Sequence, residues 1–328
     1  MDSLVTGGAG FIGSHLVEKL IRLGHKVTVL DNFSTGRVDN LEHLKKHINL
    51  VECDLSIPGD WSKNFKNKKW VFHLAALADI VPSIQMPDAY FRANVIGTFN
   101  VLQACTMSNI ERFIYTASSS CYGIPDIYPT PETAEIRMQY PYALTKRLGE
   151  ELVMHWSQIY DLSALSLRLF NVYGTRSRTS GTYGAVFGVF LAQKLANQPL
   201  TIVGDGTQTR DFTYVSDVIE AVITAVESDK KNTIYNIGSG KTVSVNKLVE
   251  LLSNKKVFIP KRPGEPNCTF ADIGKITNEL GWNPKISIED GVKELLKDIE
   301  YWRNAPVWNP ESIKEVTQDW FHYLSNSN

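Results

Sequence analysis

The stretch Thr6-Gly7-Gly8-Ala9-Gly10-Phe11-Ile12-Gly13 decides the fold prediction for this chain of 328 residues. It carries the pattern G-x-x-G-x-x-G between a strand-like run, Ser3–Thr6, and a helix-like run, Gly13–Leu23. Glycines at these spacings let the backbone turn tightly and approach a diphosphate, whose charge then lies at the helix N-terminus. A strand-to-helix turn that binds nothing would show the same glycines, so the residues that follow have to separate the two.

Asp31 ends the second strand-like run, Lys26–Asp31, close to the distance at which dinucleotide-binding chains place a carboxylate for the adenosine ribose hydroxyls. A carboxylate there repels a 2′-phosphate, so we expect NAD rather than NADP as the cofactor. Arg37 could accommodate that phosphate, or it could be an ordinary exposed loop residue. Asp54-Leu55, after the third strand-like run, suits contacts to the adenine, although Asp54 could equally cap a turn.

Short β-branched or apolar runs alternate with helical patterns in the first half of the chain, which predicts an α/β fold with a doubly wound parallel sheet. We expect a Rossmann domain over residues 1–170 and a smaller C-terminal α/β substrate domain with a helical tail over residues 171–328. Whether the strand-like segments Arg210–Val215 and Thr233–Ile237 return to the main sheet is left open. The other elements expected in the first domain are Ile48–Cys53, Trp70–Leu74, Ala93–Met107, Phe113–Ala117, Tyr142–Tyr160 and Ala164–Leu169.

The composition excludes several classes of protein. With 34 basic and 35 acidic residues the net charge is −1, which gives no electrostatic footprint for nucleic acid or an anionic membrane. Four cysteines, Cys53, Cys105, Cys121 and Cys268, show no metal-ligand spacing, so we expect neither a zinc site nor disulfides. The first residues carry no leader pattern, and no apolar run reaches the roughly 18 residues of a membrane span. We therefore expect a soluble, cytoplasmic protein that binds no metal.

Tyr142 and Lys146 lie four residues apart at the start of a helix-like run, and so share one helix face. Free tyrosine titrates at about pH 10, which is too high for a base at neutral pH. A neighbouring ammonium and a positively charged nicotinamide ring would both stabilise the phenolate and lower that pKa. An exposed Tyr/Lys pair would look the same in isolation. This pair, however, follows the glycine-rich turn by the expected number of strands, and Ser118-Ser119-Ser120 ends the strand before it.

The chain carries a set of short motifs: TGGAGFIG at 6–13, HLAA at 73–76, SSSCYG at 118–123, YALTK at 142–146, RLFNVYG at 168–174, GDGTQTRDF at 204–212 and RPGEP at 262–266. Together with Asp31 this set resembles the extended short-chain dehydrogenase/reductase family, most nearly its UDP-hexose 4-epimerases. The resemblance implies that Tyr142 is the base and acid at O4 of the sugar and that Lys146 contacts the nicotinamide ribose. Ser118 would hydrogen-bond the reacting oxygen, although a shift of one residue would give that role to Ser119.

The resemblance also implies binding residues. Those for the cofactor are Gly7, Gly10, Phe11, Ile12, Gly13, Asp31, Asn32, Asp54, Leu55, Ala75, Ala76, Tyr142 and Lys146. Those for the UDP-sugar are Ser118, Ser119, Ser120, Asn171, Arg210, Arg262, Glu265 and Thr269, with the backbone around Tyr183–Phe187 against the uracil. Arg210 and Arg262 would neutralise the diphosphate or form structural ion pairs, and Glu265 would accept the uridine ribose hydroxyls. Thr269 stands where a small residue admits an N-acetyl group.

Sugar 4,6-dehydratases of this family have Thr-Asp-Glu where this chain has Ser118-Ser119-Ser120, and serine hydroxyls are poor substitutes for the acidic pair. The resemblance therefore implies an NAD-dependent epimerase that interconverts UDP-glucose and UDP-galactose through a 4-keto intermediate, with UDP-GlcNAc and UDP-GalNAc as further candidates. A uronic acid epimerase, a decarboxylase, a reductase and a non-catalytic NAD(H) sensor stay open as alternatives. A homodimer is expected through Tyr90–Met107 and Tyr142–Tyr160, while the helix-like tail Pro310–Tyr323 has no assigned purpose.

Overall fold

The computed structural model describes residues 1–177, 184–253 and 255–325. Its main feature is a seven-stranded parallel sheet in the order β11-β6-β5-β4-β1-β2-β3, and the run from β3 to β6 is the strand order of the Rossmann fold. The α/β fold with a doubly wound parallel sheet is therefore confirmed. The strands are β1 (Asp2–Thr6), β2 (Lys26–Asp31), β3 (Ile48–Glu52), β4 (Trp70–His73), β5 (Arg112–Ser118), β6 (Ala164–Leu169) and β11 (Thr233–Ile237).

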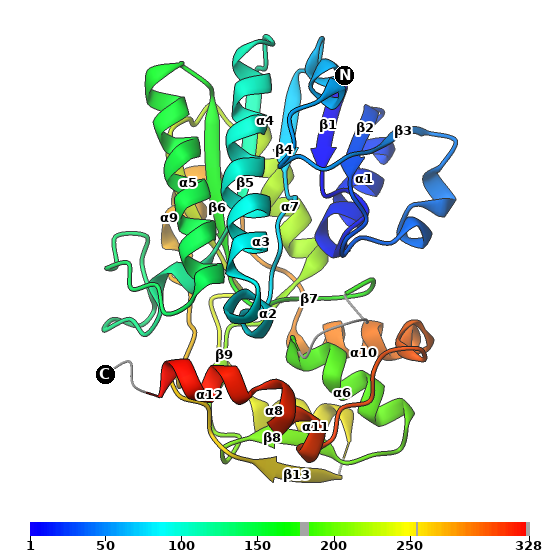
Figure 1. Ribbon diagram of the computed structural model, residues 1–328, viewed down its shortest axis with the longest axis vertical. Coiled ribbons are helices and arrows are strands. Elements are labelled where there is room, and N and C mark those ends of the chain that lie inside the picture. Colours follow the sequence, from blue (N-terminus) through cyan, green and yellow to red (C-terminus); the bar gives the residue numbers. More distant parts are fainter. Residues whose placement is uncertain (178–183, 254, 326–328) are drawn as a thin grey trace.

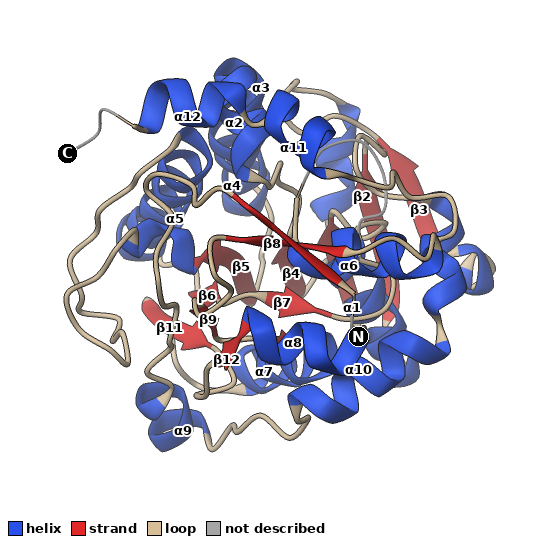
Figure 2. Ribbon diagram, turned by 90° about the horizontal axis from the view of Figure 1, so that it is seen from below, coloured by secondary structure: helices blue, strands red, loops and turns tan. Residues whose placement is uncertain are grey.

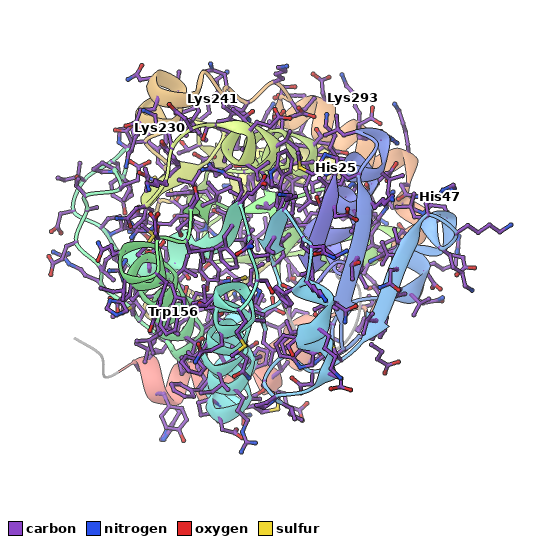
Figure 3. The ribbon with its side chains drawn as sticks, turned by 90° about the horizontal axis from the view of Figure 1, so that it is seen from above. His25, His47, Trp156, Lys230, Lys241 and Lys293 are labelled. Atoms are coloured by element: carbon purple, nitrogen blue, oxygen red, sulfur yellow. The ribbon has the colours of Figure 1, made fainter. Side chains whose placement is uncertain are left out.

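Helices cover both faces of this sheet (Figure 1). Because successive strand residues face opposite sides, Leu4 and Phe113 pack with α4 and α5, whereas Val5 and Ile114 pack with α1 and α7. In Figure 3, which looks onto the amino ends of the strands, Trp156 of α5 lies toward α4, where its ring is 5.7 Å from that of Phe99. The helices here are α1 (Phe11–Arg22), α2 (Ile80–Gln85), α3 (Pro87–Phe91), α4 (Gly97–Thr106), α5 (Pro141–Ile159), α7 (Val215–Glu227) and α9 (Gly274–Leu280).

A second layer lies beyond the carboxyl ends of the strands, at the bottom of Figure 1. Its strands form only two-stranded pairs: β8 with β13, β9 with β12, and β10 with β7. The elements are β7 (Val172–Tyr173), α6 (Val186–Leu195), β8 (Leu200–Val203), β9 (Thr209–Arg210), β10 (Thr213–Tyr214), β12 (Val243–Ser244), α8 (Val245–Leu252), β13 (Lys256–Ile259), α10 (Ile288–Lys297), α11 (Pro310–Val316) and α12 (Gln318–Leu324). Short 3-10 or π turns are η1 (Val38–Asn40), η2 (Glu42–Leu44), η3 (Asp60–Phe65), η4 (Arg92–Ile96), η5 (Ser119–Tyr122) and η6 (Ile299–Trp302).

The two strand-like segments left open by the sequence behave differently. Thr233–Ile237 returns to the main sheet as the edge strand β11, beside β6. Arg210–Val215 does not return, because the buried carboxylate of Asp211 accepts hydrogen bonds from the backbone N–H groups of Ser239 and Ala271, at 2.6 and 3.1 Å, and fixes the segment between the two layers. The division at residue 170 stays a prediction, since α7 and β11 follow it in sequence yet pack in the main layer.

Two expected helices have a different form in the structure. The helix-like run Ala93–Met107 begins as the π turn η4 and continues as α4, and the tail run Pro310–Tyr323 is divided at Thr317 into α11 and α12. In the described part of the chain, no helix has the length and apolar character needed to cross a membrane.

Candidate active site

A cavity of about 350 Å³ opens at the carboxyl ends of β1, β2 and β4, where the strand order reverses and where α/β folds bind their ligands. Thr116 of β5 also lines the cavity, as do residues of the second layer such as Tyr173 and Phe187. The cavity therefore lies between the two layers. The residues predicted for the cofactor that line it are Gly7, Gly10, Phe11, Ile12, Gly13, Asp31, Asn32, Asp54, Leu55, Ala75 and Ala76. Tyr142 and Lys146 belong to the same predicted set but lie outside this lining.

The glycine-rich turn fits a dinucleotide by its backbone. Gly7 has a φ of +69°, and a Cβ at this position would lie 2.7 Å from the backbone nitrogen of Ala75. A Cβ at Gly13 would lie 2.1 Å from the carbonyl oxygen of Gly7. Only glycine therefore lets the turn after β1 come this close to the segment after β4, and lets the first turn of α1 pack on that turn. The backbone N–H groups at the N-terminus of α1 then lie beside the cavity.

Asp31 is fixed at the end of β2 by two backbone hydrogen bonds. Its Oδ2 accepts from the N–H of Ala9 and its Oδ1 from that of Phe33, both at 2.9 Å. Burial raises the pKa of this carboxyl, and the two hydrogen bonds act against that shift. The Arg37 guanidinium lies over the ring of Tyr301, 5.4 Å from its centroid. Arg37 lines the cavity, and 38% of its side chain is exposed, so both of its alternatives stay open.

Asp54 has the turn-cap role, one of the two that the sequence left open. Its Oδ1 accepts a hydrogen bond from the Ser56 N–H at 2.8 Å, and the residue also lines the cavity together with Leu55. The contact with adenine stays a prediction.

Tyr142 and Ser118 come together where α5 begins and β5 ends. Pro141 occupies the first turn of α5, which suits a helix start, and Tyr142 follows it half-buried. The Ser118 hydroxyl is close enough to the Tyr142 phenol to lower its pKa. Ser118 Oγ also accepts a hydrogen bond from Ser120 Oγ at 2.8 Å, so Ser118 is held next to the phenol. This arrangement favours Ser118 over Ser119 as the partner of the phenol.

Lys146 lies one helical turn further along α5 and is buried, with 5% of its surface exposed. Its ammonium donates to the carbonyl oxygen of Thr116, a cavity-lining residue, at 2.6 Å, and lies 4.5 Å from the ring centroid of Tyr115. Burial lowers the pKa of Lys146 to about 7, with the nearby Glu150 carboxylate acting in the opposite direction. The ammonium thus lies behind the end of β5, one hydrogen bond away from the cavity lining.

The pKa of Tyr142 is subject to opposing influences. Burial is the largest influence and raises the pKa of the phenol above its ordinary value, while the hydrogen bond with Ser118 lowers it in part. Desolvation thus outweighs the neighbouring hydroxyl. The predicted lowering, which includes the positive charge of a bound nicotinamide, stays a prediction.

The residues predicted for the sugar nucleotide gather in two groups. Glu265 bridges two arginines: its Oε1 accepts from Arg210 Nη2 at 2.9 Å, and its Oε2 lies 3.9 Å from Arg262 Nη1. Glu265 Oε2 is buried, and no donor in the described residues hydrogen-bonds it. In the second group, Thr269 Oγ1 donates to Asn171 Oδ1 at 2.7 Å. Tyr183, where the segment expected at the uracil begins, lies outside the described residues.

The C-terminal segment contributes to the cavity, which no sequence pattern predicted. Tyr301, Ala305, Pro306 and Trp308 line the same cavity as the glycine-rich turn. The density of aromatic residues after residue 300, with tryptophans at 302, 308 and 320, was a signal that this segment is packed against the rest of the protein. Within residues 1–177, 184–253 and 255–325, no three His, Cys, Asp or Glu side chains gather as they would around a metal ion.

Comparisons with known proteins agree with this geometry. A family model described as the NAD dependent epimerase/dehydratase family matches residues 3–238, more than half of the chain. A UDP-glucose 4-epimerase of Thermotoga maritima, solved with UDP-glucose, is 34% identical, with a TM-score of 0.86, over 92% of this chain and 99% of that one. A UDP-glucuronic acid 4-epimerase of Bacillus cereus, solved with UDP-glucuronic acid and NAD, is 33% identical, with a TM-score of 0.85, over 92% and 99% of the two chains.

A relative with a different reaction is equally similar. UDP-glucuronic acid decarboxylase 1 of Arabidopsis thaliana is 34% identical over 90% of this chain and 69% of its own length. The match to the family model and the extent of these similarities show that the chain belongs to the NAD dependent epimerase/dehydratase family of enzymes, with NAD as its cofactor.

Proposed function

We propose that this enzyme is a UDP-sugar 4-epimerase in which Tyr142 moves the proton at O4 of the sugar. NAD, when bound, supplies a reversible hydride acceptor for C4. Tyr142 removes and returns the O4 proton, Ser118 hydrogen-bonds the same oxygen, and Lys146 contacts the nicotinamide ribose behind the end of β5. General acid–base catalysis of this kind contributes about 100-fold to 10,000-fold in rate.

The observation that carries the proposal is the juxtaposition of the Tyr142 phenol with the hydrogen-bonded hydroxyls of Ser118 and Ser120, where β5 ends and α5 begins. Within this group the phenol of Tyr142 is the acid–base member, because the other two side chains are serine hydroxyls; the Asp79 carboxylate lies near enough to act on the pKa of the phenol. Dehydration at C5 and C6 would need an acid and a base in addition to the group that acts at O4. A proton transfer at a single oxygen, as 4-epimerisation requires, is what this group supports.

The substrate side favours a nucleoside diphosphate sugar. Arg210 and Arg262 offer guanidinium groups for a diphosphate, and Glu265 joins them through one carboxylate oxygen. The second oxygen of Glu265, buried without a hydrogen-bond donor among the described residues, is suited to accept a ribose hydroxyl. Thr269 is small, which supports UDP-GlcNAc and UDP-GalNAc as substrates beside UDP-glucose and UDP-galactose.

Anomeric proton NMR of the purified protein tests the proposal. UDP-galactose, UDP-glucose, their N-acetyl counterparts and UDP-glucuronic acid are each incubated without added NAD. We expect at least one of them to reach a mixture of C4 epimers, and Tyr142→Phe to slow that conversion by about 100-fold or more while leaving the amount of bound NAD unchanged. Loss of the C6 carbon from UDP-glucuronic acid would assign the protein to the decarboxylases, and no turnover of any of the sugars would reject the UDP-sugar assignment.

A homodimer is part of the proposal. Phe99 and Met107 on α4 and Leu144 and Ile159 on α5 are exposed apolar side chains, on the two helices expected at the subunit contact. Their shared position on neighbouring helices supports burial against a second copy. Light scattering coupled to gel filtration should give twice the mass of the chain, and Leu144→Glu should shift the protein toward the monomer.

A further inference from the structure

The C-terminal helix α12 lies beside α2, below the first layer in Figure 1 and next to α2 and α3 in the view of Figure 2. It follows the segment that lines the cofactor cavity at Tyr301 and Trp308. The helix therefore reaches the loop that carries Arg262, although more than fifty positions separate Arg262 from Trp320 in the sequence.

Trp320 of α12 makes two contacts with that loop. Its Nε1 donates a hydrogen bond to the carbonyl oxygen of Pro263 at 2.7 Å. The guanidinium of Arg262 lies over its ring, 5.3 Å from the centroid. Trp320 is 4% exposed, so both contacts are shielded from solvent, where a cation over an aromatic ring is stabilised most. One side chain thus orients both the backbone and the charge of the Arg262 loop.

The same side of α12 also packs against the first layer. Trp320 and Leu324 form an apolar cluster with Val81 of α2, which follows directly after the cavity-lining segment 74–79. At the rim of this cluster, Gln85 Nε2 donates to Asp319 Oδ2 at 3.2 Å. The position of the Arg262 loop is therefore linked through α12 to α2.

A preoriented arginine binds a diphosphate better than a mobile one. Holding a long side chain in one rotamer costs entropy on binding, and that cost falls when the protein fixes the rotamer beforehand. Arg262 lies 3.9 Å from the Glu265 carboxylate, an ion pair long enough to leave the direction of the guanidinium to other contacts. The ring of Trp320 and the Pro263 hydrogen bond are such contacts.

We propose that Trp320 is a positioning residue for Arg262, and that α12 thereby sets the affinity of the enzyme for the diphosphate of its substrate. The inference rests on the proposed function, because it takes Arg262 as a diphosphate ligand. A role in positioning predicts an effect on ligands that carry a diphosphate and none on the nucleoside alone. A role in folding alone predicts equal effects on both.

The test measures binding of UDP and of uridine by isothermal titration calorimetry, with the NAD-loaded protein. We expect Trp320→Leu to weaken UDP binding by about 10-fold, with uridine binding unchanged within a factor of two. Trp320→Phe keeps a ring over Arg262 and should recover most of the UDP affinity. Val316→Ala, which shortens another side chain of the same apolar cluster, serves as the packing control and should leave both affinities unchanged.

A double-mutant cycle separates positioning from other effects. In an Arg262→Gln background, Trp320→Leu should weaken UDP binding by less than twofold, because the residue that it positions is already absent. With substrate, Trp320→Leu should raise KM by about 10-fold and change kcat by less than twofold. Equal losses for UDP and uridine, or additive losses in the cycle, would overturn the inference. Tight UDP binding without 4-epimerisation would instead reject the proposed function and leave the role of Trp320 intact.

Discussion

The cofactor side of the cleft and its substrate side are built from different parts of the sequence. The cofactor side consists mainly of cavity-lining residues between Gly7 and Ala76, which follow β1, β2, β3 and β4. The substrate side consists of Ser118, Tyr142, Arg210, Glu265 and Trp320, which come from separated segments and meet only in the folded chain. The first side is shaped by backbone and the second by side-chain charge, hydroxyls and aromatic rings.

Because of this difference, substitutions on the cofactor side should act through steric clashes, and substitutions on the substrate side should act through lost charge or hydrogen bonds. On the cofactor side a single added methyl group meets backbone atoms, which cannot move without displacing a strand. On the substrate side a changed side chain meets other side chains, which can rotate. Substitutions on the cofactor side should therefore cost stability and cofactor together, while those on the substrate side should change affinity and rate with the fold intact.

Gly7→Ala should have the largest effect. The added Cβ would lie 2.7 Å from the Ala75 nitrogen, at a φ of +69°, so we expect loss of bound NAD and a marked fall in thermal stability. NAD released on denaturation and the midpoint of thermal unfolding are the measurements. Gly24→Ala is the matched control, since Gly24 has a φ of +80° with no heavy atom within 4 Å of an added Cβ. It should cost only the backbone strain of about 1–3 kcal/mol and retain NAD.

Equal behaviour of the two alanine variants would contradict this account. It would mean that the positive φ, rather than the close approach of β4, explains the need for glycine at position 7.

Lys146→Met tests the charge behind the cavity. The pKa of Lys146 is lowered to about 7 in the folded protein, so between that value and its ordinary value the unfolded chain binds more protons than the folded one. The contribution of Lys146 to the free energy of unfolding should therefore rise with pH, by about 1 kcal/mol per pH unit above pH 7. Urea unfolding of both proteins at pH 7, 8 and 9 measures this. A wild-type minus variant difference that stays constant with pH would contradict the lowered pKa.

The fold and the cofactor side could be predicted from sequence because their signals are local. Alternating apolar runs predicted the main sheet strands to within one residue at each end, and the glycine pattern with Asp31 predicted NAD, which the family membership confirms. These signals work because a strand-to-helix turn that approaches a diphosphate needs specific residues at fixed spacings. Local patterns do not tell which sheet a strand joins. The strand-like segment Arg210–Val215 forms parts of two short two-stranded sheets outside the main sheet, where Asp211 holds it by hydrogen bonds.

The rest of the site depends on contacts that no spacing encodes. Nothing around Trp320 in the sequence indicates that its ring meets Arg262, and nothing around Tyr301 indicates that it closes the cofactor cavity. The rise in the pKa of Tyr142 depends on such contacts too, because it follows from the burial of the phenol in the folded protein.

Arg210→Lys should have a moderate effect confined to the substrate side. Lysine keeps the charge but loses the fork that reaches both Glu265 and a diphosphate, so we expect KM for the UDP-sugar to rise by about 10-fold with NAD content unchanged. Steady-state kinetics and the NAD content of the purified variant are the measurements. Lys241→Ala, a change at an exposed cation seen at the edge of Figure 3, should leave both unchanged. A loss of NAD from Arg210→Lys would show that the two sides of the cleft are not separable.

Tyr301→Phe should have the smallest effect and tests the one part of the cofactor side that comes from the C-terminal segment. The Tyr301 hydroxyl donates to Asn40 Oδ1 at 3.0 Å, and Asn40 Nδ2 donates to the Ala9 carbonyl oxygen at 2.9 Å, so the tail supports the glycine-rich turn from outside. Loss of this one hydrogen bond should speed NAD release by about 3-fold to 10-fold, as measured by dialysis, because a net hydrogen bond contributes about 1 kcal/mol. Tyr301→Leu also removes the ring under Arg37, so it should speed NAD release more than Tyr301→Phe does. If neither variant changes NAD release, Tyr301 is not needed to retain the cofactor. The cofactor side would then depend on the residues from Gly7 to Ala76, which are close in sequence, and only the substrate side would depend on contacts between distant segments.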